Sequence, residues 1–252
     1  RAIGLRPEEA GKMENAVYIG LSQQMAMRRQ LDVIANNLAN VNTPAFRSEK
    51  VLFEEYLQRT PGGKQPLSFV LDYGVLRNTA EGELKTTGNP LDVALSGKGF
   101  LVVDTPEGQR YTRDGHLRVS DTGQLTTADG TAVLDDRGKP IKTSATDGPL
   151  TIAADGTISN GSGRIARLDV VQFENEQAMQ KAGSGLYSTD EPAKPATGTK
   201  VMQGMIESSN VLPIVEVTKM LELQRLYEST QQLLNIDQNR QRKIIQSLAK
   251  VS

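Results

Sequence analysis

Both ends of the chain carry the seven-residue repeat that is typical of helices packed side by side. No proline occurs between residues 14 and 42, and Pro44 disfavours helical backbone just before it. The pattern therefore predicts a helix from Glu14 to Asn42 that presents one row of residues to a partner helix. Steps of three and four residues alternate along this row, which contains Val17, Gly20, Gln24, Met27, Leu31, Ile34, Leu38 and Val41.

A second helix is predicted from Pro213 to Ala249, because the chain contains no glycine and no further proline there. Ser208, Ser209 and Asn210 precede it and are suitable capping residues. Residues 237–243 include no apolar side chain, so the helix needs a packing partner to be stable. Its predicted row contains Leu223, Leu226, Thr230, Leu233, Asp237, Arg240, Ile244, Ser247 and Val251.

The middle of the chain has the pattern of short β-strands joined by tight turns. Asp114-Gly115, Thr122-Gly123, Asp129-Gly130 and Arg137-Gly138 follow one another at intervals of 8, 7 and 8 residues. No long helical pattern separates the expected strands, which disfavours a parallel sheet. Strands are predicted at 100–103, 110–113, 116–119, 124–127, 131–134, 150–152 and 167–173.

These patterns predict an α+β chain with a discontinuous terminal domain. Residues 13–44 and 200–252 are expected to pair as coiled-coil-type helices, and residues 81–199 to form an all-β antiparallel domain. Residues 45–80 are expected to be an extended linker region. Terminal helices that cannot bury their rows alone favour a subunit that assembles with copies of itself. Two stretches rich in proline and glycine, 60–66 and 190–198, are predicted linkers, and residues 1–12, before Met13, are expected to be an extension without a function.

Composition excludes several kinds of chemistry. The absence of cysteine excludes disulfides and thiolate catalysis, and the single histidine, His116, disfavours multi-histidine metal sites. The formal net charge of −1 disfavours nucleic-acid binding. No apolar run is long enough to span a membrane, and no signal peptide is recognisable. We therefore expect no cofactor, no metal and no catalytic residue.

Three apparent motifs are interpreted as turns. Residues 161–166 match the letters of a dinucleotide-binding loop, but a strand-like stretch follows where that loop requires a helix. Asp135, Asp136 and Asp155 lack the spacing of a calcium-binding loop. No carboxylate spacing indicates a glycosidase, so a peptidoglycan-binding or glycosidase-type β domain is kept only as the alternative from another functional class.

Asn36, Asn37 and Asn40 are unusual near the end of an apolar helix, because asparagine amides compete for backbone hydrogen bonds. They indicate either a frayed end with local capping or amides that bond across a helix contact.

Three blocks of sequence, at 31–47, 90–127 and 201–228, together resemble the signatures of flagellar rod and hook proteins. Ala45 stands where the first signature usually has glycine. The resemblance implies a non-enzymatic axial subunit whose terminal helices form an inner tube. The implied assembly residues are Val17, Met27, Leu31, Ile34, Asn36, Asn37, Leu38, Asn40 and Val41 on the first helix, and Leu223, Leu226, Tyr227, Leu233 and Ile244 on the second. The implied signature residues are Glu207, Ser209, Asn210 and Val211.

The resemblance also implies partners and a place in the cell. The partners would be copies of the chain, neighbouring rod proteins and the flagellar type III export apparatus. The subunit would lie in the periplasmic rod, which crosses the peptidoglycan layer and transmits torque for motility. The modest length of the chain and the sequence of residues 13–22 resemble those of the proximal-rod branch of the family. The distal-rod branch is the alternative. A rod scaffold or cap is disfavoured.

Overall fold

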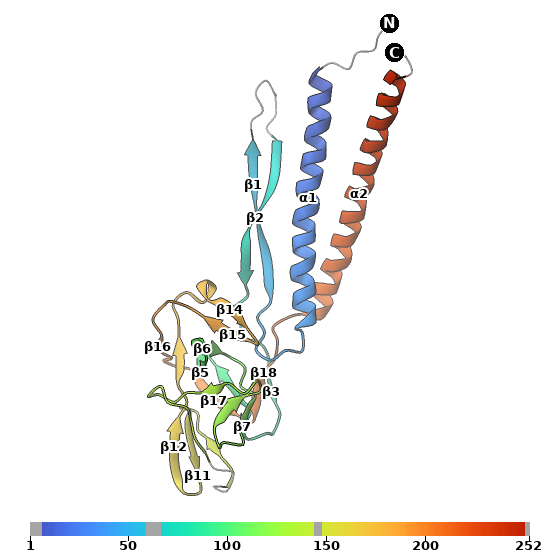
Figure 1. Ribbon diagram of the computed structural model, residues 1–252. Helices are drawn as coiled ribbons and strands as arrows, with labels where there is room; N and C mark the ends of the chain where they lie inside the picture. Colours follow the sequence, from blue (N-terminus) through green and yellow to red (C-terminus); the bar gives the residue numbers. More distant parts are fainter. Residues whose placement is uncertain (1–6, 59–66, 144–147, 250–252) are drawn as a thin grey trace. The chain divides into compact units, whose positions relative to one another are not determined.

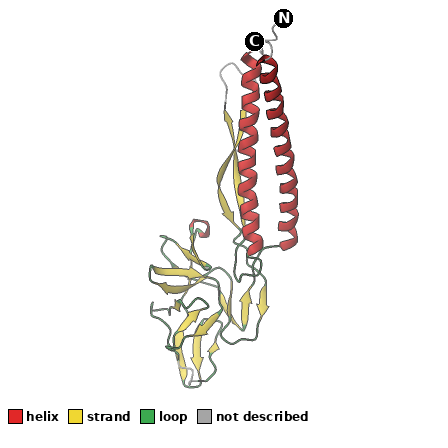
Figure 2. Ribbon diagram, turned by 45° about the vertical axis from the view of Figure 1, so that its right-hand side comes forward, coloured by secondary structure: helices red, strands yellow, loops and turns green. Residues whose placement is uncertain are grey.

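The computed structural model describes residues 7–58, 67–143 and 148–249. Helices lie at the two ends of the chain and strands lie between them, which confirms the α+β class (Figures 1 and 2). The chain divides into two compact units. Unit 1 consists of residues 1–39, 49–76 and 212–252, and unit 2 consists of residues 40–48 and 77–211.

Unit 1 contains helices α1 (Pro7–Ala39) and α2 (Pro213–Ala249), which run side by side (Figure 1). The predicted bounds of α2 are confirmed, but α1 runs from Pro7 to Ala39 rather than from Glu14 to Asn42. The helix therefore begins within the stretch that was expected to be an extension. It ends early because Asn40 begins a turn: its carbonyl accepts the Thr43 N–H at 3.2 Å, and its side-chain oxygen accepts the Thr43 hydroxyl at 3.1 Å. Neither described helix is long and apolar enough to cross a membrane.

The region expected to be an extended linker is instead a two-stranded ribbon, so that prediction was wrong. Strands β1 (Glu49–Gln58) and β2 (Leu67–Arg77) pair with each other, and β1 also contacts α1. Both strands contain the aromatic and branched residues that favour extended backbone. The predicted linker at 60–66 lies outside the described residues.

Unit 2 is built from short strands, and all the pairings resolved among its described residues are antiparallel, as predicted. The largest sheet has nine strands, with the order β14-β15-β6-β5-β9-β8-β7 and with β13 and β16 beside this path. Smaller sheets are β10-β11-β12, β17-β4 and β18-β3. A 3₁₀ turn spans Glu176–Ala178. The strands are β3 (Leu84–Thr86), β4 (Val93–Ser96), β5 (Phe100–Thr105), β6 (Gly108–Thr112), β7 (Leu117–Val119), β8 (Leu125–Thr127), β9 (Ala132–Val133), β10 (Thr151–Ile152), β11 (Thr157–Asn160), β12 (Gly163–Arg167), β13 (Val170–Gln172), β14 (Gln180–Gly183), β15 (Leu186–Ser188), β16 (Lys194–Pro195), β17 (Lys200–Gln203) and β18 (Met205–Glu207).

Strand β5 is buried on both faces and separates two cores. Leu101 and Val103 belong to an aliphatic cluster, and Phe100 and Val102 belong to an aromatic cluster. In the aromatic cluster the rings of Tyr111 and Phe173 meet edge to face, with centroids 4.7 Å apart. Unit 2 therefore has a substantial hydrophobic core of its own.

Two boundaries in this region differ from the prediction. The expected linker at 190–198 contains β16, which pairs with β13. Residues 200–207 form β17 and β18, which pair with β4 and β3, so they belong to unit 2 rather than to the C-terminal helical region. The turn interpretation of residues 161–166 is confirmed, because residues 161–162 form the turn between β11 and β12 and residues 163–166 continue into β12. Asp135 and Asp155 accept backbone N–H groups two residues ahead, as turn residues do.

Candidate assembly helices and the signature junction

The two helices of unit 1 are antiparallel and meet along the row predicted for α1. Met27 and Ile34 form a buried cluster with Leu223 of α2, and Leu31 packs against it. The two weak positions of the row have specific partners. A side chain at Gly20 would place its Cβ 2.7 Å from Cδ2 of Leu234, so glycine permits close approach. Gln24 Nε2 donates to Oε1 of Gln231 at 2.6 Å.

Among its described side chains, from residue 223 to residue 240, the row predicted for α2 is correct at alternate positions only. Leu223 and Thr230 are buried, but Leu226 is 50% exposed and Leu233 is 65% exposed. Tyr227 packs on the α1–α2 cluster instead, and Leu234 faces Gly20. The prediction was wrong here because apolar residues are adjacent at 226–227 and again at 233–234. Either member of each pair fits a heptad row.

Both helices carry large apolar side chains that the single chain leaves in solvent. On α2, Ile214 is 82% exposed and Ile236 is 65% exposed, in addition to Leu226 and Leu233. The exposed apolar residues of α1 are Tyr18, Leu21 and Met25. These exposed apolar side chains are candidates for contacts with other subunits.

Asn37 resolves the question of the asparagine cluster in favour of an amide that bonds across helices. Its Nδ2 donates to the Glu49 carbonyl at 2.7 Å and to Oε2 of Glu216 at 3.0 Å, and its Oδ1 accepts the Glu49 N–H at 2.9 Å. Glu216 also pairs with Lys219, with 2.6 Å between Oε1 and Nζ. Asn37 therefore joins α1, β1 and α2. Asn40 caps locally instead, and Asn36 is exposed.

The other residues predicted for assembly have mixed positions. Leu38 is half-buried on α1. Asn40 and Val41 follow the end of α1 and belong to unit 2, so their placement on the first helix was wrong, while their role in assembly stays a prediction. The side chains of Val17 and Ile244 lie outside the described part of the structure.

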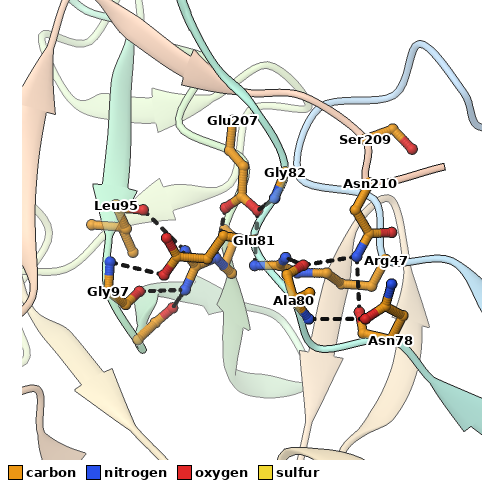
Figure 3. Close-up of polar contacts among 12 residues, drawn as sticks. Arg47, Asn78, Ala80, Glu81, Gly82, Leu95, Gly97, Glu207, Ser209 and Asn210 are labelled. Atoms are coloured by element: carbon orange, nitrogen blue, oxygen red, sulfur yellow. Dashed lines mark hydrogen bonds and ion pairs between the residues drawn. The ribbon is translucent and has the colours of Figure 1, made fainter. Parts of the chain in front are cut away.

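In unit 2 the three sequence blocks converge on one buried carboxylate, that of Glu207 (Figure 3). The Glu207 side chain is 1% exposed. Its Oε1 lies 2.8 Å from Nη2 of Arg47 and accepts the Gly82 N–H at 2.8 Å, while its Oε2 accepts from Nε of Arg113 at 2.8 Å. Arg113 also donates to the carbonyls of Leu95, Gly97 and Gly99. We call this cluster, together with Asn210, the signature junction.

Asn210 ties the chain segments of the junction to each other (Figure 3). Its Oδ1 accepts the Ser48 N–H at 2.7 Å, and its Nδ2 donates to the carbonyls of Asn78 and Ala80 at 3.0 and 2.8 Å. Its own N–H donates to the Phe46 carbonyl at 3.2 Å. One side chain and its backbone therefore hold residues 46–48 and 78–80 beside the end of β18.

The remaining signature residues play local parts. Ser209 Oγ accepts the Val211 N–H at 3.2 Å, and Val211 is buried. Residues 208–210 do not cap α2, because the Glu216 N–H bonds to the carbonyl of Leu212. Ala45 adopts a φ of 54°, the left-handed region that favours glycine, and its N–H donates to the Glu207 carbonyl at 2.8 Å.

Burial lowers the pKa of Arg47, and the carboxylate of Glu207 opposes this shift. Arg47 and Arg113 were not predicted as site residues, although both lie in the quoted blocks. Glu207 is the residue that could have pointed to them, because a carboxylate in the protein interior requires cationic or N–H partners. Among the described residues, no group of three or more His, Asp or Glu side chains is placed to hold a metal ion.

Comparison with known families agrees with the three blocks. Residues 18–47 match the family of flagella basal body rod proteins. Residues 94–160 match the D1 domain of the flagellar hook proteins FlgE/F/G, and residues 202–247 match the C-terminal region of flagellar basal body rod FlgEFG proteins.

Relatives of similar length are also known. The flagellar basal-body rod protein FlgF of Caulobacter vibrioides is 39% identical, over 95% of this chain and 100% of the relative. FlgF of Mesorhizobium japonicum is 35% identical, over 88% and 92% of the two chains. FlgG of Bacillus subtilis is 30% identical, over 88% and 94%. The chain therefore belongs to the family of flagellar basal-body rod proteins, as a structural rod subunit of the F-type.

Proposed function

We propose that this chain is a non-catalytic subunit of the proximal rod, which assembles helically with copies of itself and with neighbouring rod proteins. The exposed apolar surface of α1 and α2 is the observation that carries the proposal. A contact between two different surfaces of one subunit produces a filament when the rotation does not close into a ring. Burial of these side chains in the assembly would stabilise it by the hydrophobic effect.

In this proposal α1 and α2 pair as a coiled coil and form the inner tube, and unit 2 stands outside it. The subunit reaches the periplasm through the flagellar type III apparatus and acts in the part of the shaft that crosses peptidoglycan. Family membership supports these assignments, together with the heptad spacing of Met27 and Ile34 and of Leu223 and Thr230. The proposed assembly residues are those on exposed positions, Leu226 and Leu233 first.

The test introduces negative charge at two largely exposed leucines of α2. Leu226→Asp with Leu233→Asp is expected to lower the melting temperature of the purified chain little more than the control below, because both side chains are largely exposed. In cells that depend on this chain, the same variant should prevent rod assembly and swimming. The control is Gln224→Asp with Gln238→Asp, which adds the same charge at exposed polar positions of α2. Normal rods and normal swimming in the leucine variant would refute the proposed interface.

A further inference from the structure

We infer that the contact between Asn37 and Glu216 selects the register in which α1 and α2 pair. The inference goes beyond the proposed function, because it concerns the single chain and holds or fails before any assembly. It rests on three contacts between the helices, at Gly20–Leu234, Gln24–Gln231 and Asn37–Glu216.

The heptad repeat leaves more than one alignment open. Gln24 bonds to Gln231, and glutamines also occur seven residues to either side, at Gln224 and Gln238. If α2 slid by one heptad in either direction, another glutamine would take the place of Gln231. The Gln24 contact is therefore compatible with three registers and does not distinguish between them.

Asn37 does distinguish between them. In the two shifted registers it would face Leu223, which has no side-chain acceptor, or residue 209, which precedes α2. Asn37 is 1% exposed, and its amide nitrogen and oxygen both hydrogen-bond to the backbone of Glu49. It cannot turn toward another partner without breaking the contact with β1. A shift would leave one buried amide N–H and one buried carboxylate oxygen unpaired, which is costly.

The chemistry of the contact suits this task. The Glu216 carboxylate is 9% exposed at the side chain, lies in the first turn of α2 and pairs with Lys219. Negative charge is favoured at a helix N-terminus, and hydrogen bonds to charged groups are stronger than neutral ones. Buried polar residues are known to fix helix register at some expense of stability. The packing of Leu234 over Gly20 also favours the observed register, and it is retained in all the variants below.

The test uses the absence of cysteine from the sequence. Three chains combine Gln24→Cys with Gln231→Cys, Gln224→Cys or Gln238→Cys, and their rates of disulfide formation report the native and the two shifted registers. All three lack the Gln24 amide, so the comparison isolates the remaining contacts. With Asn37 present, the native pair should dominate. With Asn37→Ala, the ratio of shifted to native cross-links should rise about tenfold, the effect expected for loss of a hydrogen bond to a charged group.

Matched variants separate register from stability. Glu216→Leu removes the acceptor and should act like Asn37→Ala, whereas Glu216→Gln keeps an acceptor oxygen and should preserve the native ratio. Asn235→Ala is the control, because this asparagine is exposed on α2. An unchanged ratio in Asn37→Ala and Glu216→Leu would overturn the inference. So would an equal loss of all three cross-links, which would show a role in stability alone. Because the purified chain is measured, failure of the rod proposal would not affect this result.

Discussion

Replacing Glu207 by glutamine removes the charge at the centre of the signature junction while nearly preserving its shape. A glutamine oxygen can still accept from Gly82 and Arg47, but its Nε2 would face the Nε–H of Arg113 at the 2.8 Å now spanned by a hydrogen bond. Among the described residues, Arg113 would keep Glu81 alone as an ionic partner, at 3.7 Å and with that carboxylate 40% exposed. The substitution therefore leaves two buried guanidinium groups with less than one full counter-charge.

The expected loss follows from the bonds involved. The charge-assisted bond from Arg113 contributes about 2 kcal/mol, and the weakened bond from Arg47 about 1 kcal/mol more. The sum agrees with the roughly 3–5 kcal/mol measured when one partner of a buried ion pair is removed. For a unit of this size the melting temperature should fall by about 10 °C.

Urea unfolding followed by near-UV circular dichroism can measure this loss, because Tyr111 and Tyr187 are buried in the aromatic core of unit 2. The control is Glu174→Gln, which breaks an ion pair with Lys194 on the surface of the same unit and should produce no measurable change. A loss in Glu207→Gln of less than about 1 kcal/mol would refute the reasoning. It would show that water or a rearranged side chain compensates both guanidinium groups.

Further predictions concern substitutions at four positions. Burial, together with Asp136 and Asp135, raises the pKa of Asp169, so the folded state retains a proton that the unfolded chain releases, and stability falls as pH rises through the folded-state pKa. Asp169→Asn should therefore raise the urea midpoint at neutral pH, with no gain below the ordinary pKa of 3.8. Gly130 has a φ of 87°, which alanine adopts only with strain. Gly130→Ala should therefore lower the free energy of unfolding by about 1–2 kcal/mol. Gly123→Ala should lower the free energy of unfolding by more than Gly130→Ala does, because its Cβ would also lie 2.7 Å from the Thr143 carbonyl oxygen. Gly20→Leu should displace Leu234, weaken the helix pair by about 1–3 kcal/mol and speed amide exchange in α2.

Local patterns predicted the helices well and the ribbon poorly. Pro213 and the stretch free of glycine and proline set the bounds of α2, because both act on the backbone itself. The α1 row followed from periodicity, and even Gly20 and Gln24 belong to it. The ribbon formed by β1 and β2 was missed because the stretch between the strands is rich in proline and glycine. The whole region was therefore predicted to be a linker. Periodicity also could not choose between Leu226 and Tyr227, since that choice depends on the partner helix.

The junction shows why the candidate site was only partly predictable. The signature residues Glu207 and Asn210 were named from the third block, whereas Arg47 and Arg113 belong to the first and second. No sequence pattern connects Arg47 with a glutamate 160 residues later, since their pairing depends on how unit 2 folds. What the sequence does contain is three short blocks, each with a polar residue that would be costly to bury alone.

The three blocks are understandable as one structural requirement. Arg47 needs the carboxylate of Glu207, Glu207 needs both Arg47 and Arg113, and Asn210 needs the backbone groups of residues 46–48 and 78–80. Loss of any one partner leaves a buried polar group unpaired in the others, which costs more than the contact itself contributes. The same argument applies to Asn37 and Glu216 in unit 1. A chain that keeps one of these blocks therefore has a physical reason to keep all three, independent of any contact that its assembled neighbours make.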